Sequence, residues 1–250
     1  MSDADFNNGC YGRCPNCDTT HTLGIGNSRR YARDLMANIS RLERLDIDVP
    51  ATNADPQLNL KTLFPGDRGH MFGVLECQTP DKRTVWLKAF SSLRGGIRFV
   101  PGWVKPNISQ LDYLRVIDPQ ERAIKAVSNQ CNIEMHPERK TELARDRAVR
   151  SQSLWNEMKD LYVFHNFAGR SATIGDLFGA KGVPGGVGEC CAPKLLCAAA
   201  IAGLTPLGLS EFYWGPKTQY DGKTSGTFYP CCEQRCRPLL GFILCDHASS

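Results

Sequence analysis

Apolar residues recur along the chain with two different periods, and each period predicts a different kind of element. From Asn27 to Leu45 apolar side chains return every three or four positions, which predicts an amphipathic helix. Residues 71–77 and 84–91 are short apolar runs joined by a polar connection, a pattern typical of a β-hairpin. Residues 97–104 resemble a third strand, interrupted by Pro101-Gly102.

The middle of the chain contains two strong helix starts. Asp118 is a good N-cap, because Pro119 suits the first turn and Glu121 stands at the capping-box position. A second start at Pro137 opens a long, heavily charged helix, and Gly169 is its expected end. The middle is therefore expected to be mainly helical.

The last third is richer in Cys and Gly. A glycine-rich loop (residues 182–189) leads into a helix closed by Gly203, then a strand over residues 206–215 and a Cys-bearing turn that enters another helix. These patterns predict an α+β fold with a helical middle, a small antiparallel sheet and a Cys-rich C-terminal helix-strand-helix unit. The expected organisation is a Cys/His knuckle over residues 1–26, an α+β body over 27–180, and a C-terminal unit over 181–250 packed on that body.

The composition is that of an ordinary globular protein, with 42% hydrophobic and 22% charged residues. No stretch approaches the roughly 18 apolar residues of a membrane span. The chain begins with polar residues and lacks the pattern of a signal peptide, so we expect a cytoplasmic protein with no membrane partner. The net charge of +4 permits an acidic partner without requiring one.

Twelve cysteines are many for such a chain, and most of them cluster near its two ends. Without a signal peptide, closely spaced Cys favours metal binding over disulfides. The first cluster ends in His21 and offers four candidate ligands for a structural zinc ion, which prefers tetrahedral thiolate and imidazole coordination. A distant residue is the alternative to Cys10 as one of them. The candidate ligands are Cys10, Cys14, Cys17 and His21.

The second cluster is predicted to form where two helices begin. Cys190 stands at the start of one helix, while Cys232 and Cys236 stand at the start of another, so we expect these three sulfurs to converge on one ion. Zinc deaminases take their ligands from two helix starts in a similar way. The sequence departs from that pattern, because Ala192 occupies the position of the Glu proton shuttle and the last two cysteines are spaced differently.

Other interpretations of these regions stay open. A thiol nucleophile at Cys190 or Cys191 with His165 as its base is one alternative. The aromatic run over residues 211–214 could stack on bases, although aromatic residues in a strand more often belong to a core. A basic stretch of the long helix could follow a phosphate backbone or form a solvated helix face. Its cations are Arg139, Lys140, Arg145, Arg147 and Arg150.

Several segments together resemble the N-terminal accessory region of the long RluA-like pseudouridine synthases. They include GHMFGVLEC, VPGW, SQSLWNEMKDLYVFHNFAG, GECCAPKLL, LSEFYWG and FYPCCEQRCRPLL, and they span most of the chain. By this resemblance Cys190, Cys232 and Cys236 match the cysteines of the family, and Cys231 is a local addition. The resemblance implies a link to RNA modification and an RNA partner.

The reaction of those synthases is not expected here. It needs a catalytic Asp in an Arg-Leu-Asp motif followed by Thr-Ser-Gly, whereas Arg44-Leu45-Asp46 continues as Ile-Asp-Val-Pro inside the first predicted helix. A chain of 250 residues also has no room for both the accessory region and a synthase domain. We therefore expect a metal-binding, RNA-associated protein. The alternatives are a metal- or thiol-dependent enzyme acting on a nucleobase or small molecule at the C-terminal cysteines, and a purely structural interaction protein.

Overall fold

A four-stranded antiparallel sheet forms the centre of the molecule. The computed structural model describes residues 9–63, 69–91, 97–179, 186–218 and 222–247. The strand order is β4-β3-β7-β8, so the predicted hairpin is confirmed and the predicted strand near residue 206 pairs beside it. The strands are β3 (His70–Gln78), β4 (Thr84–Phe90), β7 (Thr205–Trp214) and β8 (Phe228–Tyr229).

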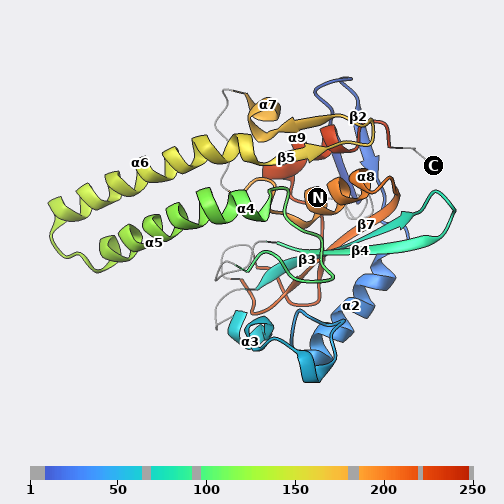
Figure 1. Cartoon of the computed structure of the whole chain (residues 1–250), viewed down its shortest axis with the longest axis horizontal. Coiled ribbons are helices and arrows are strands. Elements are labelled where there is room, and N and C mark those ends of the chain that lie inside the picture. Colours follow the sequence, from blue (N-terminus) through green and yellow to red (C-terminus); the bar gives the residue numbers. More distant parts are fainter. Residues whose placement is uncertain (1–8, 64–68, 92–96, 180–185, 219–221, 248–250) are drawn as a thin grey trace.

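Helices cover both faces of this sheet (Figure 1). On one face α2 (Ser28–Leu42) packs over side chains such as Phe72 and Val74. On the other face α8 (Cys191–Ile201) packs over the alternate residues of the same strand, including Leu75. Burial on both faces explains why β3 is a nearly continuous apolar run rather than an alternating one.

Two long helices form a hairpin that projects from the body (Figure 1). They are α5 (Asp118–Ile133) and α6 (Pro137–Leu161), and α6 begins where the sequence predicts. Asp118 is not the predicted N-cap, because Ile117 before it is already helical and the helical run begins after Ser109, whose side chain caps it. The prediction that the second helix continues to Gly169 is wrong. The chain becomes extended after Leu161, because Phe164 is buried in the core through β5 (Val163–His165), which pairs with β6 (Ser171–Thr173).

Two further expectations are corrected. Residues 97–104 do not form the predicted strand. Instead the indole ring of Trp103 packs against Phe72 and Phe90, and its Nε1 donates a 2.8 Å hydrogen bond to the carbonyl of Leu45. The first helix ends at Leu42, so Arg44-Leu45-Asp46 lies outside it. The shorter helical segments are η1 (Ala51–Asn53), η2 (Pro56–Leu58), α3 (Leu60–Leu63), α4 (Gln110–Asp112), the π-helical turn η3 (Tyr113–Ile117) and α7 (Ile174–Phe178).

The two ends of the chain pack against each other. The hairpin of β1 (Cys10–Arg13) and β2 (Thr20–Leu23) lies on α9 (Glu233–Ile243). A Cβ atom at Gly12 would come within 2.3 Å of the backbone nitrogen of Gly241, so only glycine fits this approach. The α+β fold and its Cys-rich C-terminal unit are confirmed. No helix among the described residues is long and apolar enough to cross a membrane.

Candidate metal centres

The first candidate centre joins the two ends of the chain. Ligand atoms of Cys14, Cys17, His21 and Cys245 all lie within 4.8 Å of one another. The sulfur of Cys17 is 3.2 Å from Nε2 of His21 and 4.0 Å from the sulfur of Cys245. Zinc bonds of about 2.0–2.3 Å in a tetrahedron separate ligand atoms by roughly 3.5–4 Å. The four side chains could therefore close around one ion.

The turn between β1 and β2 brings the first two cysteines together. The backbone nitrogen of Asp18 donates to the carbonyl of Cys14 at 3.0 Å, and Asp18 adopts a left-handed conformation with φ of 58°. The backbone nitrogen of Asn16 donates to the sulfur of Cys14 at 3.4 Å. This tight turn places both sulfurs of the Cys-x2-Cys pair on one side.

Cys10 does not belong to this group, and the distant ligand that replaces it is Cys245. The reason lies in the alternation of β1, where Cys10 and Gly12 share the buried side that faces α9. Cys10 is fully buried and forms a side-chain hydrogen bond with Cys231. Spacing alone had made Cys10 look like a ligand of the knuckle.

The ionisation of the first centre suits metal binding. A hydrogen bond from the backbone of Thr19, followed by one from His21, lowers the pKa of Cys17 to about 6. Burial raises the pKa of Cys245 to about 12. The sulfur of Cys17 is thus a thiolate at neutral pH. A bound cation would favour loss of the proton from Cys245.

The second candidate centre lies where α8 and α9 begin. The sulfurs of Cys190, Cys232 and Cys236 lie within 4.8 Å of one another, which is the convergence that the sequence predicts. Cys190 is the N-cap of α8 and Cys232 is the N-cap of α9. Cys236 is fully buried, whereas the other two residues are partly exposed.

The three sulfurs of the second centre share their protons unequally. Hydrogen bonds from the thiols of Cys190 and Cys236 lower the pKa of Cys232 to about 2. Backbone groups of Arg235 and Cys236 at the start of α9 act in the same direction. The pKa of Cys190 rises, first because of its hydrogen bond to Cys232. Without metal, Cys232 is the thiolate of the group.

Glu189, the residue before Cys190, belongs to a buried ionic network that the sequence analysis did not predict. The carboxylate of Glu189 accepts a hydrogen bond from the hydroxyl of Tyr162. It also lies 2.9 Å from the guanidinium group of Arg98 and 3.8 Å from the ammonium group of Lys194. The ammonium group of Lys194 also donates to the carbonyl of Phe90 at 2.8 Å. The single Lys in the otherwise apolar helix CAPKLLCAAAI was the available signal. These partners hold Glu189 in a structural ion pair.

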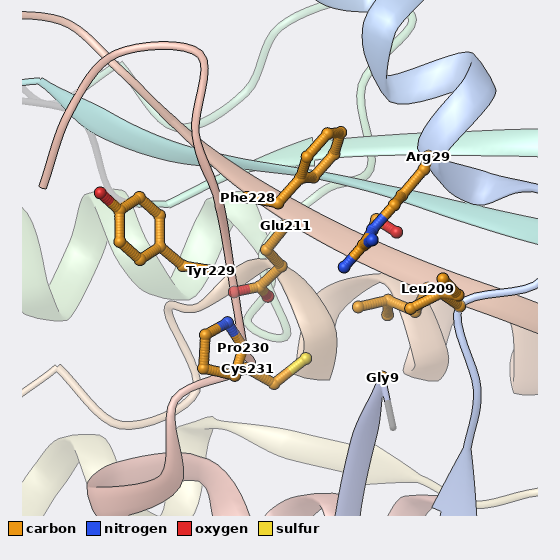
Figure 2. A pocket seen from close by; sticks show the side chains of 10 residues that line it. Gly9, Arg29, Leu209, Glu211, Phe228, Tyr229, Pro230 and Cys231 are labelled. Carbon is orange, nitrogen blue, oxygen red and sulfur yellow. The ribbon is translucent and has the colours of Figure 1, made fainter. Parts of the chain in front are cut away.

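Glu211 is the second buried acid close to the cysteines. Glu211 is 4% exposed. Its carboxylate accepts a 2.7 Å hydrogen bond from the backbone nitrogen of Ala192, at the start of α8. Burial raises the pKa of Glu211 to about 7. Figure 2 shows its carboxylate directed toward Pro230 and Cys231 in a cavity of about 20 Å³, which has space for about one water molecule.

The structure does not assemble the nucleophile and base considered from the sequence. Cys191, the first residue of α8, is fully buried; its thiol donates to the carbonyl of Met71 at 3.3 Å, and burial raises its pKa. The backbone of His165 instead contacts the sulfur of Cys197 at 3.4 Å, six residues further along the helix. Six residues of helix span about 9 Å.

All five basic residues singled out on α6 are exposed. Arg139 pairs with Glu142, and Arg150 lies 2.9 Å from Asp146. At about 100° per residue, four of the five fall within roughly 100° of the helix circumference. Arg145 falls on another side. The four that share a face are Arg139, Lys140, Arg147 and Arg150.

Two other candidate segments have structural roles. Phe212 and Tyr213 are buried in the core, so the core interpretation of the aromatic run is confirmed for them. Asp46 is 3% exposed; it accepts the backbone nitrogen of Asp55 at 2.9 Å and lies 3.5 Å from Arg44. These contacts fix a loop, although the sequence had suggested a helix there.

The fold and the two centres define an α+β protein in which six of the twelve cysteines gather into two separate groups, each of which could hold a metal ion. No family model, no curated protein and no solved structure matches this chain.

Proposed function

We propose that this protein is a zinc-binding, RNA-associated protein related to the accessory region of pseudouridine synthases. The observation that carries the proposal is the presence of two separate sets of Cys and His ligand atoms, each within 4.8 Å. Sulfur and imidazole ligands in compact groups suit zinc better than magnesium or calcium, which prefer oxygen. Four ligands at the first centre suit a structural ion that ties the two ends together.

The RNA partner is supported by two observations. The α5–α6 hairpin projects from the body (Figure 1). Its helix α6 carries four exposed cations on one face. Exposed Arg and Lys bind phosphates irrespective of sequence. The second support is the resemblance of segments such as GECCAPKLL and LSEFYWG to the accessory region. Uridine isomerisation is not part of the proposal, because the buried Asp46 is bonded to its own loop.

The metal content of the purified protein tests the first half of the proposal. We expect two zinc ions per chain by elemental mass spectrometry. Cys232→Ser and the double change Cys14→Ser with Cys17→Ser should each lower that number to one, since each leaves only two ligands at its centre. Cys131→Ser is the matched control, because this buried cysteine belongs to neither set. Wild-type protein without zinc, or variants that keep both ions, would contradict the proposal.

A salt series tests the RNA half. We expect single-stranded RNA to bind with an affinity that falls as salt rises, measured by fluorescence anisotropy. The double change Arg147→Glu with Arg150→Glu should weaken binding. It should also reduce the steepness of the slope of log affinity against log salt by about 1.4, because each lost phosphate contact contributes roughly 0.7 to that slope. Arg145→Glu is the control on another side of α6. Binding without salt dependence, or an equal effect of the control, would overturn the RNA assignment.

A further inference from the structure

The two centres differ in the number of ligands that the protein supplies. The first offers four and the second offers three. All twelve Cys and all five His of the chain lie in the part that the structure describes, and none of the others there joins the second group. A tetrahedral zinc ion in the second centre would thus have one coordination position that no Cys or His of this chain fills.

We propose that zinc at Cys190, Cys232 and Cys236 carries an exchangeable water molecule, and that this position accepts neutral nitrogen donors such as a ring nitrogen of a heterocycle. The inference rests on the zinc binding proposed above and assigns the second centre a ligand-binding role. Three protein ligands with one open position is the arrangement of catalytic zinc sites, whereas four protein ligands is that of structural sites.

The three cysteines differ in exposure to solvent, and this difference shows from which side a ligand can reach the open position. Cys236 is fully buried and forms the base of the centre. Cys190 and Cys232 each reach solvent in part. The fourth position of a tetrahedron neighbours all three sulfurs, so it borders the two cysteines that reach solvent, and a dissolved molecule can approach it from their side.

The charge of the centre favours a neutral ligand. Three thiolates and a divalent cation sum to about −1. Cys190 and Cys232 cap α8 and α9, and each helix start supplies about half a positive charge, so the two together offset that −1. A fourth anion would leave the centre negative. Water or a neutral nitrogen donor adds no charge.

Cobalt substitution with imidazole as the probe tests the inference. We expect two Co²⁺ per chain, and we expect imidazole to shift part of the visible d–d absorption in a saturable way. Cys14→Ala with Cys17→Ala, which leaves only two ligands at the first centre, should keep the shift with one Co²⁺ per chain. Cys232→Ala should lose the shift and retain the bands of the first centre. Azide at equal concentration should shift the bands less than imidazole does.

The outcomes separate this inference from the function on which it rests. Two Co²⁺ ions bound to wild type, with no response to imidazole in wild type or in the Cys14→Ala, Cys17→Ala variant, would overturn the open position and leave the zinc assignment intact. A stronger response to azide than to imidazole would overturn the preference for neutral ligands. A wild type that binds fewer than two ions would contradict the proposed function itself.

Discussion

At the scale of single residues, Glu211 is expected to make stability depend on pH. Burial raises its pKa to about 7 from 4.5, so the folded chain holds a proton between these values that the unfolded chain releases. Folding stability should therefore fall as pH rises from about 4.5 to about 7. Glu211→Gln can still accept the hydrogen bond from Ala192 but cannot ionise. At pH 8 we expect it to be more stable by on the order of 2–3 kcal/mol.

Urea unfolding from pH 5 to pH 8 measures this effect as the difference between variant and wild type. The difference cancels contributions from groups that titrate in the same range and do not interact with Glu211. Glu142→Gln is a matched control, because that carboxyl group is exposed on α6. Parallel pH profiles for wild type and Glu211→Gln would show that Glu211 is already ionised when buried.

Single residues also show which parts of the centres the sequence could supply. Cys14, Cys17 and His21 were predictable, because a short turn brings ligands at this spacing together. Cys245 was not predictable, since it stands 228 positions from Cys17 and reaches the centre only through the packing of α9 on β1. Cys10 was misassigned because spacing does not reveal which side of a strand faces the core.

At the scale of elements, the pattern of apolar residues predicted which helices and strands exist better than it predicted where they end. The strands β3, β4 and β7 and the start of α6 follow from periodicity and capping signals. The signal at Asp118 misled, because α5 continues a helical run that begins at Gln110. The end of α6 did not, because the aromatic residues after Leu161 continue a helical pattern but are buried as a strand against the core. Here tertiary packing overrides local propensity.

Close approaches between elements were also hidden in the sequence. A Cβ atom on Gly73 would lie 2.6 Å from the Cβ atom of Cys191, so the start of α8 rests directly on β3. This contact fixes Cys190 above the sheet, whereas the approach of Gly241 to the backbone of Arg13 fixes α9 against β1. A sequence shows a glycine but not the backbone or side chain that approaches it.

At the scale of the whole molecule, the first centre should control both ends of the chain together. From the sequence alone, metal removal would loosen only residues 1–26. Because Cys245 replaces Cys10 in the structure, we expect chelation to raise hydrogen exchange in β1, β2 and residues 244–247 in the same step. His247 supports this coupling, since its Nε2 lies 2.8 Å from the carbonyl of Thr22.

Hydrogen exchange followed by mass spectrometry, with and without chelator, measures the coupling. The α5–α6 hairpin should keep its protection, because it projects from the body and contributes no ligand to either centre (Figure 1). Cys245→Ser should reproduce the loosening at both ends in zinc-containing buffer, whereas Cys131→Ser should leave those segments protected. Exchange that rises in β1 and β2 while residues 244–247 remain unchanged would show that the ion does not join the two ends.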